Sequence, residues 1–143
     1  MKAITIKEVE YVAFRLAQEM MSFNEPIPDF STRFPNILES CLAAPFQTFG
    51  GKSPYHDLTS KAAVFFYLMV KNHPFQNGNK RIAMTTLFVV LHKNGKWLSV
   101  DTQELYNFTM WIAQSPARAK EETIKATGNF LKSHLTGSNR GNE

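Results

Sequence analysis

The stretch HPFQNGNKR, residues 73–81, combines groups that could bind a phosphate chain with one that could accept a proton. A helix is predicted to begin at about Asn79, and a helix N-terminus presents unpaired backbone N–H groups and a partial positive charge. The backbone at Gly78 and Lys80 would add to this anion site. Arg81 offers a planar guanidinium that matches two phosphate oxygens. The stretch therefore predicts a site for a polyphosphate.

His73 is the predicted proton acceptor of this site. Pro74 disfavours helical geometry in the residue before it, so the imidazole should be released from helix packing. A histidine in this position can take the proton of an attacking hydroxyl at neutral pH, a role typically worth about 10² to 10⁴ in rate. Phe75 is predicted to anchor the loop to the core. A histidine beside a proline and a turn before a helix cap are each common structural features, but their joint occurrence favours an active site.

Other candidate sites carry less weight. GGKS, residues 50–53, resembles the end of a phosphate-binding P-loop, but that motif needs a glycine where Phe46 stands and a buried strand before it. The single cysteine, Cys41, cannot form an internal disulfide bond and is predicted to be a small buried hydrophobe. No catalytic role is assigned to the remaining histidines, which are His56, His92 and His134.

Length and composition favour one compact domain. The chain has 143 residues, 43% of them hydrophobic, so we expect a single domain over residues 1–135 and a disordered tail at 136–143. The longest apolar run, residues 62–70, is too short for a membrane span, and no secretion signal is evident, which predicts a soluble cytoplasmic protein. The net charge is +4, but the 16 cations are dispersed, so direct nucleic-acid binding is not expected.

The elements that position the loop are predicted to be helices. Residues 57–72, with Asp57 as the N-cap, and residues 79–94, stopped by Gly95, are apolar nearly all round and should form the central pair of a bundle. A Gly-Gly pair within residues 46–55 predicts a small hairpin, or flap. The remaining expectations are a helix over 5–22, a loop over 23–35, a short helix over 36–44, an extended piece over 97–100, and helices over 101–114 and 117–134.

Residues 73–81 closely resemble the motif of the Fic/Doc family, HxFx(D/E)GNxR, and that of its death-on-curing branch, HxFx(D/N)(A/G)NKR. ILESCLAAP, the turn ahead of YHDL, and HKNGKW are similar to that branch as well, so the resemblance covers about residues 36–100. It implies an all-α Fic fold, a helical bundle with a small β-hairpin flap at about 46–55. It also implies an enzyme that uses ATP and Mg²⁺ to modify a hydroxyl side chain of a target protein.

The resemblance assigns roles to particular residues. His73 would be the general base, while Gly78 and Asn79 would cradle the phosphates and Arg81 would clamp them. Asn77 would be the metal ligand, although an amide is weaker than the Asp or Glu that the family more often has there. The flap would hold the target segment by strand-like backbone pairing through Gln47, Thr48, Phe49 and Gly50.

Three functions, two of them transfer reactions, remain open at this point. The death-on-curing branch is known for phosphorylating elongation factor Tu, and Lys80 stands where AMP-transferring members usually have Gly, which favours phosphoryl transfer to Ser or Thr. Gly78 agrees with the AMP-transferring members, so AMP transfer to a target hydroxyl is the alternative. Asn77 raises a third alternative, a degenerate nucleotide-binding module without transfer.

The sequence also predicts how the activity would be restrained. Many Fic proteins carry an inhibitory motif, (S/T)xxxE(G/N), but no Ser or Thr of this chain has Glu four residues later. The inhibitor should therefore be a separate chain. This expectation fits a toxin that has an antitoxin partner.

Overall fold

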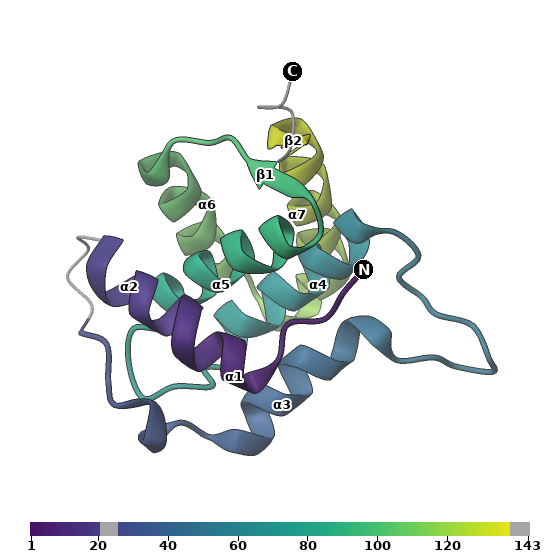
Figure 1. The fold of residues 1–143 in the computed structure, drawn as a ribbon. Coiled ribbons are helices and arrows are strands. Elements are labelled where there is room, and N and C mark those ends of the chain that lie inside the picture. Colours follow the sequence, from purple (N-terminus) through teal and green to yellow (C-terminus); the bar gives the residue numbers. More distant parts are fainter. Residues whose placement is uncertain (21–25, 138–143) are drawn as a thin grey trace.

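The computed structural model describes residues 1–20 and 26–137, and these residues form a bundle that is almost entirely helical (Figure 1). The all-α fold class predicted from the sequence is confirmed, with one small antiparallel sheet. No helix within the described residues is long and apolar enough to cross a membrane. In chain order the elements are α1 (Ile6–Glu8), a π-helical segment (Val9–Phe14), α2 (Arg15–Met20), a 3₁₀ turn (Phe30–Thr32), α3 (Pro35–Ala43), a 3₁₀ turn (Ala44–Phe46), α4 (Leu58–Lys71), α5 (Asn79–Lys93), β1 (Lys96–Leu98), α6 (Thr102–Gln114), a 3₁₀ turn (Ala117–Ala119), α7 (Lys120–His134) and β2 (Leu135–Gly137).

Helices α4 and α5 form the centre of the bundle, with α6 and α7 on one side and α1 to α3 on the other (Figure 1). Eight residues of α4 and nine of α5 are buried, in agreement with their nearly continuous apolar patterns. Each large apolar side chain buried there contributes roughly 1.5 to 3 kcal/mol. Thr85 and Thr86 are tolerated in this core because their hydroxyls donate to the carbonyls of Arg81 and Ile82, at 2.7 and 2.5 Å.

The helix boundaries follow local signals in the sequence. Asp57 caps α4 as predicted, and its carboxylate accepts a hydrogen bond of 2.8 Å from the Ser60 N–H. Helix α5 ends as predicted before Gly95, which has a φ of 78° that favours glycine. Pro35 occupies the first turn of α3, where its missing N–H has no cost.

Cys41 is fully buried in α3, as the sequence predicted for a small hydrophobe. Burial raises the pKa of its thiol to about 11. Because the thiolate is the reactive form, this cysteine is chemically inert in the folded chain.

The N-terminal helix differs from the prediction of one helix over residues 5–22. A six-residue π-helical segment separates α1 from α2, and residues 21 and 22 lie outside the described part. The apolar stripe still faces the core, since Val9 is buried and Leu16 is half-buried. In the predicted loop, residues 23–25 are likewise outside the described part.

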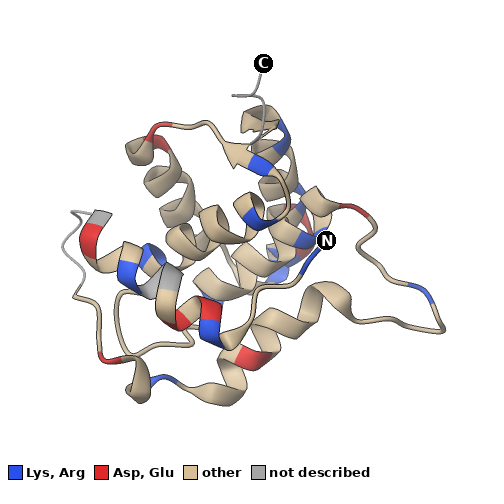
Figure 2. Cartoon of the chain, in the orientation of Figure 1, with Lys and Arg blue, Asp and Glu red and all other residues tan. Residues whose placement is uncertain are grey.

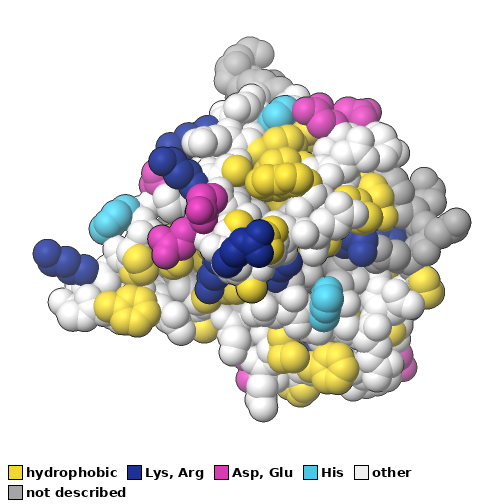
Figure 3. All heavy atoms as spheres, turned by 180° about the vertical axis from the view of Figure 1, so that it is seen from behind, with side chains coloured by type: hydrophobic (Ala, Val, Ile, Leu, Met, Phe, Trp, Pro, Cys, Tyr) yellow, Lys and Arg dark blue, Asp and Glu magenta, His cyan; other side chains and the backbone are white. Residues whose placement is uncertain are grey.

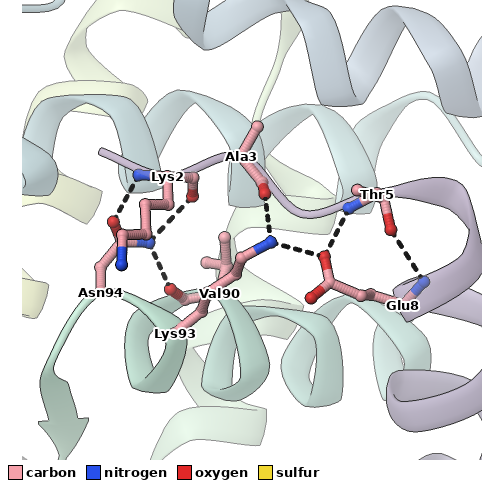
Figure 4. Close-up of polar contacts among 7 residues, drawn as sticks. All are labelled: Lys2, Ala3, Thr5, Glu8, Val90, Lys93 and Asn94. Carbon is pink, nitrogen blue, oxygen red and sulfur yellow. Dashed lines mark hydrogen bonds and ion pairs between the residues drawn. The ribbon is translucent and has the colours of Figure 1, made fainter.

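The N-terminal residues are fastened to the end of α5 by a set of polar contacts, here called the N-terminal clasp (Figure 4). The Asn94 amide bonds the backbone of Lys2 in both directions, at 2.5 and 3.0 Å. The Lys93 ammonium donates to the Ala3 carbonyl at 2.8 Å and pairs with the Glu8 carboxylate at 2.7 Å. The same carboxylate accepts from the Thr5 N–H at 2.9 Å, which completes a capping box on α1. The clasp thus holds α1 against the C-terminal end of α5.

Replacing Glu8 with Gln should lower the free energy of unfolding by about 1 kcal/mol or less near neutral pH. The hydrogen bond from Lys93, followed by the one from the Thr5 backbone, holds the pKa of the Glu8 carboxyl below its ordinary value of 4.5. A depressed carboxyl pKa contributes stability above the unfolded value, and that contribution is lost as pH falls through the folded pKa. Urea unfolding at several pH values should therefore show that the difference in unfolding free energy between Glu8→Gln and the unaltered protein disappears below about pH 4. Glu10→Gln, at an exposed neighbour, is the control, and an equal loss there would contradict the assignment.

The C-terminal end of the described chain corrects the predicted tail. Strand β2 pairs antiparallel with β1, with Trp97 opposite Thr136 and Leu98 opposite Leu135. Thr136 and Gly137 are therefore ordered, because backbone pairing with the extended piece after α5 supplies hydrogen bonds that composition does not reveal. The rest of the predicted tail, residues 138–143, lies outside the described residues.

Candidate active site

The loop between α4 and α5 opens with His73 in a left-handed backbone conformation. Helix α4 ends at Lys71, Asn72 is its C-cap, and His73 follows with a φ of 49°. Many helices end on a left-handed residue just past the cap, where Gly is the usual choice. Pro74 comes next and cannot continue the helix. The imidazole is thus carried out of the helix, and the His73 side chain is exposed.

Three contacts hold this loop in place. The Asn79 side chain accepts from the Phe75 N–H at 2.9 Å and donates to the Phe75 carbonyl at 2.8 Å. The Phe75 ring is 1% exposed and packs against Phe30, with ring centroids 6.0 Å apart. From α3, the Phe34 N–H donates to the Pro74 carbonyl at 2.8 Å. The side-chain amide of Asn79, a residue that the resemblance assigns to the phosphates, is therefore engaged with the loop. The group of Asn79 that remains for an anion is its backbone N–H.

Gly78 caps α5 in a left-handed conformation, with a φ of 68°. A Cβ at this position would lie 2.8 Å from both the Pro26 carbonyl oxygen and the Ile27 Cδ1. The sequence assigned Gly78 to the phosphate site, and the structure shows in addition that the chain's own segment at Pro26 and Ile27 approaches this glycine closely. Its N–H donates to the Asn77 Oδ1 at 2.8 Å.

The loop borders an open cleft of about 510 Å³, here called the loop cleft. Pockets that hold small ligands usually measure about 300 to 1,000 Å³, so a nucleotide is of suitable size. His73 and Lys80 both line the cleft, which brings the predicted base and a predicted phosphate ligand to the same cleft. The described lining residues are Phe34, Val70, His73, Phe75, Gln76, Asn77, Gly78, Asn79, Lys80 and Ala113.

The charge of the loop cleft favours an anion. Lys80 supplies a cation, and the N-terminus of α5 supplies partial positive charge. No carboxylate occurs among its described lining residues. Across residues 1–20 and 26–137, no group of three or more His, Cys, Asp or Glu could hold a metal ion. The cleft therefore fits a phosphate chain, and a Mg²⁺ ion there would depend on phosphate oxygens, with Asn77 as a weak protein ligand.

Arg81 does not line the loop cleft. Its side chain is 7% exposed, and its Nη2 donates to the carbonyl of Ala17 in α2. The Arg81 side chain points toward α2 because α2 packs against α5. The clamp on phosphates that the resemblance implies would require exchange of this hydrogen bond for a phosphate contact.

The predicted flap is present, but the structure does not bring it to the loop cleft. Phe49 and Lys52 exchange backbone hydrogen bonds of 2.7 and 3.1 Å around Gly50 and Gly51, whose φ values of 59° and 79° suit a tight hairpin turn. The flap precedes α4 whereas the loop follows it, and the 14 residues of this helix span about 21 Å (Figure 1). All four predicted docking residues are exposed and outside the loop cleft, namely Gln47, Thr48, Phe49 and Gly50.

Part of the lining of the loop cleft was not predicted from the sequence. It is built by Phe34 before α3, Val70 in α4 and Ala113 in α6. Phe34 is 45% exposed, so part of its side chain is accessible to a ligand in the cleft. Lys71 holds α6 at this part of the lining, because its ammonium donates to the Ala113 and Ser115 carbonyls at 3.2 and 2.5 Å. No local pattern marks these residues, since they meet only through the packing of three helices.

Comparisons with known proteins agree with this arrangement. The model of the Fic/DOC family matches residues 4–91, which include the central helix pair and the loop. Toxin Doc of Mycolicibacterium smegmatis is 33% identical over 73 residues, which make up 51% of this chain and 56% of that protein. The match thus spans little more than half the length of this curated relative. Comparison with solved structures gave no significant match.

Proposed function

We propose that this chain, which belongs to the Fic/DOC family, transfers the terminal phosphoryl group of ATP to a Ser or Thr hydroxyl of a target protein. The observation that carries the proposal is the loop cleft, which is lined by both an exposed imidazole and an anion-favouring helix N-terminus. The relative named Toxin Doc suggests a toxin-like role. Elongation factor Tu is the first target to test, on the basis of the resemblance.

His73 is the proposed general base. Its imidazole takes the proton of the target hydroxyl as that oxygen forms a bond to the γ-phosphorus, and the bond to the β,γ-bridging oxygen breaks to release ADP. The proton then stays on His73 until it is returned to solvent. The left-handed turn and the hydrogen bond between Phe34 and Pro74 orient the imidazole at the cleft.

The α5 end of the cleft is the proposed phosphate site. Lys80 and the backbone N–H groups of the first turn of α5 would contact phosphate oxygens, and the φ of Gly78 sets the direction of that turn. Mg²⁺ carried by ATP would neutralise phosphate charge, with Asn77 as its candidate ligand from the protein. Arg81 would hold α5 against α2 in the resting structure and reach phosphate only after leaving Ala17.

The apolar part of the cleft lining, formed by Phe34, Val70 and Ala113, is the proposed site of the adenine ring, and Phe34 is its main element. Phe34→Ala should weaken ATP binding about tenfold, because loss of a base-stacking aromatic side chain usually costs about 1 to 3 kcal/mol. The substitution leaves the backbone bond to Pro74 intact, since the Phe34 N–H makes that bond. Titration calorimetry with ATP measures the effect. Phe49→Ala, which removes an aromatic side chain that is 69% exposed on the flap, should leave binding unchanged. Equal affinities of the Phe34→Ala variant and the unaltered protein would rule out adenine stacking on this part of the lining.

A separate antitoxin chain is the proposed restraint. The inhibitory motif of self-restrained Fic proteins is absent from the sequence, and the similar Mycolicibacterium protein is named a toxin. Expression of the chain alone should therefore slow growth of the host. Co-expression with a protein encoded beside it should restore growth.

Label transfer tests the proposed reaction. The protein is incubated with Mg²⁺, purified elongation factor Tu or a bacterial lysate, and ATP labelled at either the α or the γ phosphate. Protein labelled from γ-labelled ATP alone is the expected result. Label from the α position would show AMP transfer and overturn phosphoryl transfer.

A binding module without transfer is the second candidate, because no described residue lining the loop cleft is a carboxylate. This candidate predicts Mg²⁺-dependent binding of ATP and no label on protein from either position. Asn77→Asp would then supply a harder oxygen ligand for Mg²⁺. Gain of transfer in that variant would favour the binding module, and equal transfer by both forms would exclude it.

A further inference from the structure

A second open cleft lies between the flap and α7, at the end of α4 remote from the loop cleft. It has a volume of about 670 Å³ and is here called the flap–α7 cleft. Phe49, Pro54 and Tyr55 line it from the flap segment, and α7 provides the opposite wall. Seen from behind, with the flap projecting at the left, this side of the molecule presents cationic and hydrophobic side chains close together (Figure 3).

The cations of this cleft come from one helix. Lys120, Lys125 and Lys132 of α7 all line it and are exposed, and none forms an ion pair with another described residue. Lys52, in the flap, adds a further cation on this side of the molecule (Figure 2). Glu121 is the one carboxylate among the described lining residues, and the nearby Asp57 is engaged as the N-cap of α4. The three lysines outnumber the carboxylates of Glu121 and of Asp57, which interacts electrostatically with Lys132, so the cleft keeps an excess of positive charge.

Apolar residues of α4 and α7, Ala63 and Ile124, line the cleft together with polar ones. Lys125, Gly128 and Lys132 fall on one face of α7, at spacings of three and four residues. Gly128 sits between the two lysines, and a Cβ there would lie 3.9 Å from the Ala63 Cβ, which is ordinary contact. The glycine thus leaves space for a side chain from outside the molecule, beside Ile124.

The flap wall is held in position before any ligand arrives. The Lys61 ammonium donates to the carbonyls of Pro45 and Tyr55, at 3.1 and 2.5 Å, and so ties the two ends of the flap segment to α4. A preformed wall lowers the ordering cost of binding.

We propose that the flap–α7 cleft binds an extended acidic segment of a partner protein, with carboxylates against the α7 lysines and an apolar side chain over Gly128. The observations favour a polypeptide over a nucleic acid. A phosphate backbone would meet the Glu121 carboxylate inside the cleft, and apolar side chains, those of Phe49 and Ile124 among them, line the cleft beside the lysines.

This site is separate from the loop cleft. The two clefts share no lining residue and lie toward opposite ends of α4, with their lining residues of that helix about 10 to 16 Å apart along it. Binding at the flap–α7 cleft should therefore proceed without ATP and should persist in a His73→Ala variant. Failure of a partner segment to bind at the flap–α7 cleft would leave the proposed phosphoryl transfer untouched. Absence of phosphoryl transfer would likewise leave the proposed binding at the flap–α7 cleft untouched.

The test measures fluorescence anisotropy of a short labelled peptide in which Glu alternates with Ser around a central Leu. The full chain should bind this peptide, and the triple variant Lys120→Glu, Lys125→Glu, Lys132→Glu should bind at least about tenfold more weakly. Lys2→Glu, Lys7→Glu, Lys96→Glu is the matched control, because it has the same net charge but alters exposed lysines outside the cleft. A second variant, Gly128→Leu, fills the space over Gly128 without changing charge and should also weaken binding. Thermal melts confirm that each variant is folded.

Three outcomes would overturn the proposal. The first is an equal loss of affinity in both triple variants, which would show a general effect of net charge. The second is undiminished binding by Gly128→Leu. The third is tighter binding of a single-stranded oligonucleotide than of the peptide, with the same dependence on the α7 lysines.

Discussion

Replacing His73 with Ala is expected to lower the rate of transfer from ATP at least about 100-fold, while ATP binding and the fold are retained. The imidazole is exposed at the loop cleft, so its loss removes the proton acceptor without opening a hole in the core. The loop itself is held by Phe75, by the Asn79 side chain and by the backbone bond from Phe34, and none of these contacts involves the imidazole. Initial rates with γ-labelled ATP, together with calorimetric affinity for ATP, measure the two expectations separately.

His92→Ala is the matched control, because it removes an exposed histidine at the other end of α5. It should transfer label at the rate of the unaltered protein. Transfer that survives in His73→Ala would remove the general-base assignment. Equal losses in both variants would point to damage of α5 rather than to chemistry.

Gly78→Ala should lower the free energy of unfolding by about 2 to 5 kcal/mol. A left-handed residue with a side chain costs roughly 1 to 2 kcal/mol, and overpacking adds about 1 to 3 kcal/mol. The second term arises because the new Cβ would lie 2.8 Å from the Pro26 carbonyl oxygen, a backbone atom that cannot rotate away. Urea unfolding monitored by circular dichroism gives the difference.

Gly95→Ala separates the two terms of this prediction. Its φ of 78° is as unfavourable for alanine as that of Gly78, but no atom lies within 4 Å of the added Cβ. This control should therefore lose only the conformational part, about 1 to 2 kcal/mol. Equal losses in the two variants would show that the segment around Pro26 yields, and that Gly78 is required for its backbone angle alone.

Much of the bundle could be predicted because local signals and tertiary packing agree. The all-round apolar patterns of α4 and α5 have no solvent face, so a central position is the one arrangement that buries them. Asp57 and Gly95 act through neighbouring backbone groups and therefore mark helix ends wherever those helices pack. The ordered strand at Leu135–Gly137 was missed because its partner, β1, lies far away in the sequence.

In the candidate site, too, some residues are placed by local geometry and others by the packing of distant helices. His73, Asn77 and Lys80 are brought to one cleft by a short loop whose ends are both helix termini, and such geometry is local. The direction of Arg81 is decided by α2, and the wall formed by Phe34 is decided by the packing of α3. Neither follows from the spacing of residues 73–81. The position of the flap likewise depends on the length of α4, which separates it from the loop.

The left-handed turn at His73 has an evolutionary consequence. Asparagine tolerates this conformation well and lies one nucleotide change away from histidine in the genetic code. A lineage under pressure to silence the activity can therefore exchange the base for an amide and keep an intact, well-folded protein. Both clefts would survive such a change, so descendants of an active member could persist as binding proteins after catalysis is lost.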